Sequence, residues 1–153
     1  HGTGDEYLRR LANVLKEYLD GLYLKRRTSF DSEPVLSRLS GDEFAVYLPG
    51  LSETEGMEAA EELRKAVEAL YFTESESSFT ASLGVAFFPG NGTNVKELLT
   101  KADAAMYRAK ERGRNRVHAY RDEDHIWQHV REDEMSAYGD DARVVYVTES
   151  RTR

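Results

Sequence analysis

Cysteine is absent from the chain of 153 residues, and basic residues are in the minority. The absence of cysteine excludes disulfide frameworks, thiolate zinc sites and cysteine nucleophiles. The 28 acidic residues outnumber the 21 basic ones, and the resulting formal charge of -7 repels nucleic acid. No apolar run approaches the roughly 20 residues of a membrane span, and no signal-peptide pattern is present. We therefore expect a cytoplasmic protein that binds no nucleic acid and has no membrane segment in this chain.

The length of the chain and its apolar content of 40% fit one globular domain. The chain begins at His1 rather than at methionine and enters a helix signal almost at once. We therefore interpret it as a fragment and expect further sequence upstream in the parent protein.

Apolar residues that recur every three to four positions predict three amphipathic helices. The first is expected from about Gly4 to Leu19, behind the pattern of a capping box. The second follows a capping box that begins at Ser52, and its length is about 17 residues. The third opens at Asn94, and Gly113 is the residue expected just after its end.

Runs rich in β-forming residues predict strands between these helices. The predicted strands are Val35–Leu39, Phe44–Leu48, Phe79–Phe88 (one long strand or a pair) and Arg116–Tyr120. The mixture of short strands and covering helices indicates an α/β or α+β layered fold. From residue 121 onward the composition becomes charged, so we interpret residues 121–153 as a linker or C-terminal appendage with one strand-like run at 144–147.

Two adjacent carboxylates, Asp42 and Glu43, lie in the tight turn predicted between the first two strands. Hard cations such as Mg²⁺ take carboxylate oxygens and commonly bridge to substrate phosphates. The turn is therefore a candidate metal site for nucleotide chemistry. The alternative is an ordinary solvated turn, which Ser40 and Gly41 also suit.

A stripe of four residues follows one side of the predicted third helix, namely Asp103, Tyr107, Lys110 and Arg114. The basic pair at its end can grip phosphate groups. The alternative is a solvated helix face, on which the helix dipole favours cations near the C-terminus.

Glycines flank the start of the predicted first helix, at Gly2 and Gly4, and Asp5 follows them. A ligand can approach the backbone N–H groups of such a helix start. Asp5 can accept hydrogen bonds from the N1–H and N2–H₂ groups of guanine. In the alternative interpretation, Asp5 is a dipole-favoured residue of the first turn and the glycines only shape the entry.

Taken in order, these segments resemble the GGDEF domain, the diguanylate cyclase module of bacterial cyclic-di-GMP signalling. Four motifs over roughly residues 1–120 carry the resemblance. They are HGTGD at 1–5 (family pattern H-x-x-G-D), RLSGDEF at 38–44 (R-x-G-G-D-E-F), SLGVA at 82–86 (S-x-G-[IV]-A), and ADAAMYRAK at 102–110 followed by GRNRV at 113–117.

The resemblance implies a GGDEF domain over 1–120, with a central, mainly antiparallel sheet flanked by helices, like the palm of nucleotide cyclases. It also implies a signal-transduction transferase that joins two GTP molecules into cyclic di-GMP, with release of two pyrophosphates. The family reaction takes place across a homodimer of GGDEF domains and needs Mg²⁺ or Mn²⁺ as cofactor.

Site residues follow from the resemblance by position. Asp42 matches the metal-ligand position, and Glu43 matches the next signature acid, with a role in metal or phosphate chemistry; both are expected to be catalytic. The positions expected to bind GTP are Asp5 for guanine, Gly41 in the signature turn, and Lys110 and Arg114 for the phosphates. Arg38 is expected to form a structural ion pair.

The sequence also departs from the family pattern. Ser40 replaces the first glycine of the signature, which would strain the turn if its φ is positive. The family's first strand, which carries a further metal-binding Asp, is missing from this chain and is expected upstream. The R-x-x-D pattern of the product-inhibition site is replaced by DSEP at 31–34.

These departures leave a second hypothesis beside the active cyclase. In it, the chain is a catalytically inactive GGDEF module that binds GTP or a partner domain and regulates an attached EAL phosphodiesterase or sensor. Residues 122–135 resemble the charged connector that leads from GGDEF to EAL domains, although the EAL signature is absent. A third hypothesis is a dimerisation scaffold that binds no nucleotide.

Overall fold

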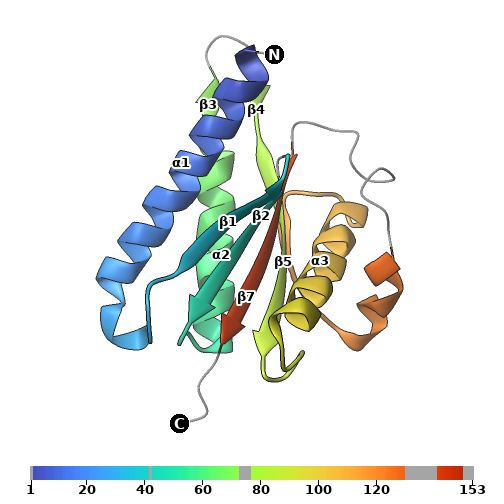
Figure 1. The fold of residues 1–153 in the computed structure, drawn as a ribbon. Coiled ribbons are helices and arrows are strands. Elements are labelled where there is room, and N and C mark those ends of the chain that lie inside the picture. The colour runs from blue at the N-terminus through green and yellow to red at the C-terminus, as the bar shows by residue number, and fades with distance from the viewer. Residues whose placement is uncertain (1, 42, 73–76, 130–140, 150–153) are drawn as a thin grey trace.

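The computed structural model describes residues 2–41, 43–72, 77–129 and 141–149 (Figure 1). This part of the chain forms three α-helices, namely α1 (Gly2–Lys25), α2 (Glu53–Glu68) and α3 (Val95–Glu111). The strands are β1 (Val35–Ser40), β2 (Glu43–Pro49), β3 (Tyr71–Phe72), β4 (Ser77–Ser78), β5 (Thr80–Phe88), β6 (Arg116–Ala119) and β7 (Asp141–Glu149). Two 3₁₀ helices complete the described elements, η1 (Arg27–Ser29) and η2 (Asp122–His129).

The main sheet has five strands in the order β1-β2-β7-β5-β6, and β3 pairs with β4 in a separate small sheet. Helices α1 and α2 cover one face of the main sheet, and α3 covers the other (Figure 1). The alternation of side chains along β2 explains the two cores. Val46 and Leu48 belong to the cluster that includes α1 and α2, whereas Ala45 and Tyr47 pack with α3. The α+β fold predicted from the sequence is confirmed.

Helix α3 lies directly against β5 because Gly84 has no side chain. A Cβ atom at Gly84 would overlap the carbonyl oxygen of Ala102 and the backbone nitrogen of Met106. Ala102 and Met106 are themselves fully buried. The glycine inside the SLGVA motif is therefore required by the close approach of the helix backbone to the strand.

The predicted start signals of α2 and α3 are confirmed. The hydroxyl of Ser52 accepts a hydrogen bond from the backbone N–H of Glu55, and the Glu55 carboxylate accepts one from the N–H of Ser52. Asn94 caps α3 by accepting from the N–H of Glu97 at 2.8 Å. These caps satisfy backbone groups that have no partner inside the helix, which is why the sequence pattern suffices to find them.

Helix α1 is longer than the predicted span 4–19, because it continues to Lys25. Leu22 is buried and extends the apolar stripe by a further turn. Gly21 lies inside this turn, where glycine costs about 1 kcal/mol relative to alanine, and the burial of Leu22 outweighs that cost. Although α1 is the longest described helix, no helix in this part of the chain is long and apolar enough to cross a membrane.

The strand directions differ from the expected mainly antiparallel sheet. The hairpin of β1 and β2 is antiparallel, but β7 runs parallel to both β2 and β5, and β6 runs parallel to β5. The sequence pattern did not include β7 in the sheet, and β7 fills the position between β2 and β5. The boundary between residues 1–120 and 121–153 stays a prediction, with β7 as the contribution of the second segment to this sheet.

Candidate functional site

The turn between β1 and β2 and the C-terminal end of α3 lie at the same end of the molecule (Figure 1). One row of paired Cα positions crosses the sheet there: Glu43 pairs with Arg143 of β7, and Arg143 pairs with Ser82 of β5. Ser82 in turn pairs with Arg116, the first residue of β6. Three strand spacings separate the ends of this row, or roughly 14 Å. The acidic turn and the basic loop after α3 therefore lie at the same end of the strands of the sheet.

The turn between β1 and β2 depends on Gly41, whose φ is +44°. The side chain of Arg38 supports this turn by donating a hydrogen bond from Nε to the carbonyl oxygen of Gly41 at 2.7 Å. This hydrogen bond gives Arg38 a structural role in the turn, and the ion pair expected for Arg38 stays a prediction. Ser40 is the last residue of β1, and the positive φ described in this turn is at Gly41.

The carboxylates of the candidate metal site are only partly described. Glu43 is the first residue of β2, and 8% of it is exposed. Asp42 and the side chain of Asp5 lie outside the described residues, so their roles stay predictions. Within the described ranges, no three His, Asp or Glu side chains gather as a metal site. Two adjacent carboxylates, one of them fixed by a strand, nevertheless fit the donor preference of Mg²⁺ or Mn²⁺.

Helix α3 ends at the glycine that the sequence predicted. The N–H of Gly113 donates to the carbonyl of Lys110 at 3.2 Å, and the N–H of Arg114 donates to the carbonyl of Ala109 at 3.0 Å. Gly113 has a φ of +124°. This is the Schellman pattern of a helix C-terminus, in which two otherwise unpaired carbonyls receive donors.

Lys110 does not lie on a solvated face, because only 3% of it is exposed. Tyr107, which shares the predicted stripe, is also buried and belongs to the core between α3 and the sheet. Asp103 and Arg114 are half-buried. The solvated-face alternative is therefore wrong for Lys110 and Tyr107, and a buried ammonium group is kept charged only by polar or anionic partners.

The two residues after Gly113 also have left-handed backbones. The φ angles are +64° at Arg114 and +50° at Asn115. A Cβ costs roughly 1–2 kcal/mol in this region; asparagine tolerates it because its short polar side chain can form local hydrogen bonds, which arginine does not do. Such strain persists only where the surroundings fix the conformation, and it is common at functional sites.

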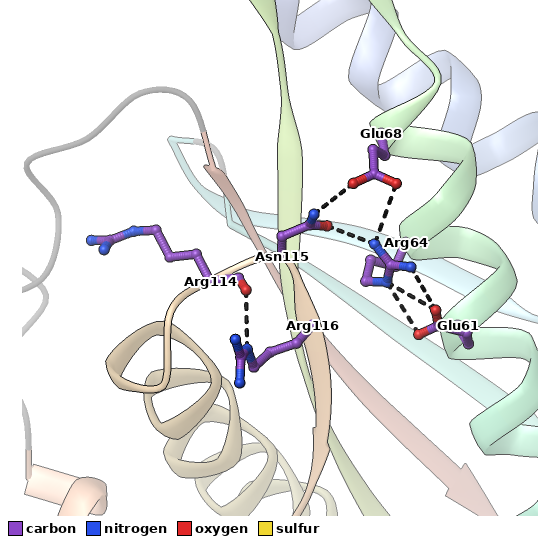
Figure 2. A network of polar contacts seen from close by, with 6 residues as sticks. All are labelled: Glu61, Arg64, Glu68, Arg114, Asn115 and Arg116. Atoms are coloured by element: carbon purple, nitrogen blue, oxygen red, sulfur yellow. Dashed lines mark hydrogen bonds and ion pairs between the residues drawn. The ribbon is translucent and has the colours of Figure 1, made fainter.

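A network of polar side chains fixes this loop to α2 (Figure 2). Arg64 donates from Nη1 to the Oδ1 of Asn115 at 2.7 Å, and Asn115 donates from Nδ2 to the Oε2 of Glu68 at 2.6 Å. Glu61 holds the other side of Arg64 through hydrogen bonds of 2.6 to 3.1 Å. These hydrogen bonds keep the pKa of Glu61 below its ordinary value and raise the pKa of Arg64.

No sequence pattern assigns a role to Arg64 or Asn115, which are 51 residues apart. The readable signals were the place of Asn115 in the GRNRV motif and the spacing of Arg64 from Glu61 and Glu68, three and four residues along one helix. That spacing predicts ion pairs on α2 and says nothing of the loop after α3.

Comparison with known proteins gives the same family that the motifs suggest. The family model described as "Diguanylate cyclase, GGDEF domain" matches residues 1–116. This range contains all of α1, α2, α3 and β5, together with both ends of the row described above.

Several relatives are diguanylate cyclases by name. The chain is 33% identical over 124 residues to diguanylate cyclase DosC of Shigella sonnei, an overlap of 79% of this chain and 24% of that protein. It is 34% identical over 119 residues to diguanylate cyclase DgcP of Pseudomonas aeruginosa, covering 76% and 16%. It is 37% identical over 90 residues to the bifunctional diguanylate cyclase/cyclic di-GMP phosphodiesterase MucR of Pseudomonas aeruginosa, covering 58% and 13%. The chain thus spans less than a quarter of the length of each of these three relatives.

Proposed function

This chain belongs to the GGDEF domain family, a family of cyclic-di-GMP signalling, and on that premise we propose that it is the GTP-binding module of a diguanylate cyclase. Two such modules, each with one GTP, face each other as a homodimer. The 3′-hydroxyl of each GTP attacks the α-phosphate of the other, so that a new 3′-oxygen–phosphorus bond forms and the bond to pyrophosphate breaks. The hydroxyl proton is released, and two GTP give one cyclic di-GMP and two pyrophosphates.

The basic end of α3 is assigned to the phosphates. Lys110 is buried beside the core and Arg114 follows the helix end. Their positive charges hold the β- and γ-phosphates and balance the charge of the pyrophosphate as it leaves. The left-handed backbone of Arg114 supports this assignment, because it sets the direction in which the side chain leaves the loop.

The acidic turn is assigned to the metal side of the triphosphate. Asp42 and Glu43 would hold Mg²⁺ or Mn²⁺, and Asp5 would accept hydrogen bonds from guanine. When bound, the metal supplies positive charge next to the attacking oxygen and the α-phosphate. Gly41 lets the turn adopt its left-handed backbone, and Arg38 fixes the carbonyl of that glycine.

One observation carries the proposal: the acidic turn and the basic loop lie at the same end of the strands of the sheet. The row of paired residues from Glu43 to Arg116 joins them. The test is to incubate the full-length protein with GTP and Mg²⁺ and to separate the nucleotides by chromatography. We expect cyclic di-GMP and pyrophosphate in a ratio of one to two. A protein that binds no GTP would overturn the proposal and leave the dimerisation scaffold.

One observation favours the second candidate, an inactive module that regulates an attached EAL phosphodiesterase or sensor. Ser40 stands where the family signature has glycine. The name of MucR shows that cyclase and phosphodiesterase activities occur together in a relative. Binding of GTP without formation of cyclic di-GMP would select this candidate over the enzyme.

A further inference from the structure

We propose that Asn115 is a positioning residue for Arg114. Its side chain is held between Arg64 and Glu68 of α2, and this clamp keeps the loop after α3 in the conformation that presents Arg114 to the triphosphate. The inference rests on the proposed function, which assigns Arg114 to phosphate binding.

The clamp uses the whole amide group of Asn115. The carbonyl Oδ1 accepts from the Nη1 of Arg64 at 2.7 Å, and the Nδ2 donates to the Oε2 of Glu68 at 2.6 Å. Both partners are on α2, one turn apart. An amide that makes a hydrogen bond at each of its two ends is fixed in position and in orientation.

The α2 side of the clamp is itself rigid. The side chain of Arg64 is only 13% exposed, and its guanidinium donates from Nε and Nη2 to Glu61. Glu68 lies 3.5 Å from the same guanidinium. A planar guanidinium with carboxylates on two sides cannot rotate without breaking charge-assisted hydrogen bonds, so it provides a fixed anchor.

Arg114 and Asn115 project to opposite sides of the loop (Figure 2). The side chain of Asn115 points toward α2, whereas that of Arg114 points away from α2 across the end of α3. Because the two residues are adjacent and both left-handed, a change in the backbone of Asn115 would redirect Arg114. Arg116, the residue after Asn115, donates from Nε to the carbonyl oxygen of Arg114 at 3.1 Å. This hydrogen bond holds the backbone of the loop from the other side of Asn115.

The test is a double-mutant cycle read by calorimetric titration of GTP with Mg²⁺ into the full-length protein. Asn115→Gly removes both hydrogen bonds but keeps a residue that adopts positive φ freely, so it releases the clamp without adding strain. We expect it to weaken GTP binding by up to about tenfold. In the Arg114→Ala background, we expect the same substitution to change the affinity by less than about twofold.

Two further variants separate positioning from simple loss of stability. Asn94→Gly is the matched control, because it removes one hydrogen bond at the opposite end of α3; it should lower thermal stability but leave GTP affinity unchanged. Glu68→Gln keeps an acceptor for Asn115 and should bind GTP like the wild type, whereas Glu68→Ala should weaken binding. This pair also tests the proposal if Asn115→Gly does not fold.

The outcomes are distinct. Equal losses from Asn115→Gly in both backgrounds, or unchanged binding in Asn115→Gly, would overturn the positioning role while the proposed function stands. A wild-type protein that binds no GTP would overturn the proposed function and the positioning role together.

Discussion

The imidazole Nε2 of His118 and the Oδ2 of Asp124 lie 2.7 Å apart in a buried contact between β6 and η2. The same carboxylate oxygen accepts a hydrogen bond from the backbone N–H of Arg121 at 2.8 Å. The Nε of Arg108, on α3, lies 3.9 Å from the other oxygen. The carboxylate of Asp124 thus joins three elements: β6, α3 and η2.

Asp124→Ala is expected to lower the free energy of unfolding by about 1–3 kcal/mol, because it leaves buried donors without their acceptor. Asp124→Asn, which keeps one acceptor oxygen, should cost less. Urea denaturation measures both, with the exposed neighbour Asp122→Ala as control. Equal stability of Asp124→Ala and the control would show that the cluster does not hold η2 in place.

Gly84→Ala is expected to destabilise the fold by about 1–3 kcal/mol, since the new Cβ overlaps the backbone of α3. Gly21→Ala is the matched control, because a Cβ at Gly21 meets nothing within 4 Å and the position is inside α1. The control should raise stability by about 0.5–1 kcal/mol. Thermal unfolding of the two variants should therefore shift in opposite directions, and a shift in the same direction would contradict the packing described for β5 and α3.

Ser40→Gly restores the family signature, yet we expect it to change the rate of cyclic-di-GMP formation by less than about threefold, because Ser40 is in a strand. Gly41→Ala should instead cost about 1 kcal/mol of stability, since the positive φ is at Gly41. Rates come from chromatography and stabilities from urea denaturation. A large gain of activity in Ser40→Gly would show that Ser40 is the reason for any weak activity.

We expect Glu61 to contribute to the pH dependence of the unfolding free energy. Its pKa is lowered from 4.5 by the hydrogen bonds from Arg64. A carboxyl group with a lowered pKa in the folded state stabilises the fold above its ordinary pKa, and this contribution disappears as the pH falls through the lowered value. The difference in unfolding free energy between wild type and Glu61→Gln should therefore be largest above pH 4.5 and shrink below it.

The control for that experiment is Glu17→Gln on the exposed side of α1. Its difference from the wild type should stay small across the same pH range. A difference for Glu61→Gln that grows toward acid would have the wrong sign and would contradict the ion pair with Arg64.

Local signals explain how much of the fold the sequence predicts. The capping box at Ser52, the N-cap at Asn94, the hairpin and the helix end at Gly113 each depend on residues within four or five positions, and these are confirmed. The capping box predicted for the first helix does not mark its start, because α1 already begins at Gly2. The extent of α1 was underestimated although Leu22 continues the apolar periodicity, and the structure places Leu22 in the core. The position and direction of β7 depend on pairing with strands that are far away in the sequence, and no local pattern encodes that pairing.

In the candidate site, too, the residues within short motifs could be predicted from the sequence, whereas contacts between distant segments could not. Asp42, Glu43, Lys110 and Arg114 were found because each belongs to a short motif. The burial of Lys110 could not be predicted, because a cation near a helix C-terminus has the same sequence pattern whether it is solvated or buried. The clamp on Asn115 was missed because its partners are on another helix.

The acidic turn and the basic end of α3 are proposed to form one triphosphate site. Calorimetric titration of GTP into the full-length protein, with and without Mg²⁺, tests it in the wild type, Asp42→Ala and Lys110→Met. We expect wild-type binding to require Mg²⁺, Asp42→Ala to lose that requirement together with most of the affinity, and Lys110→Met to weaken binding by about tenfold or more. Wild-type affinity and Mg²⁺ dependence in both variants would contradict a common triphosphate site.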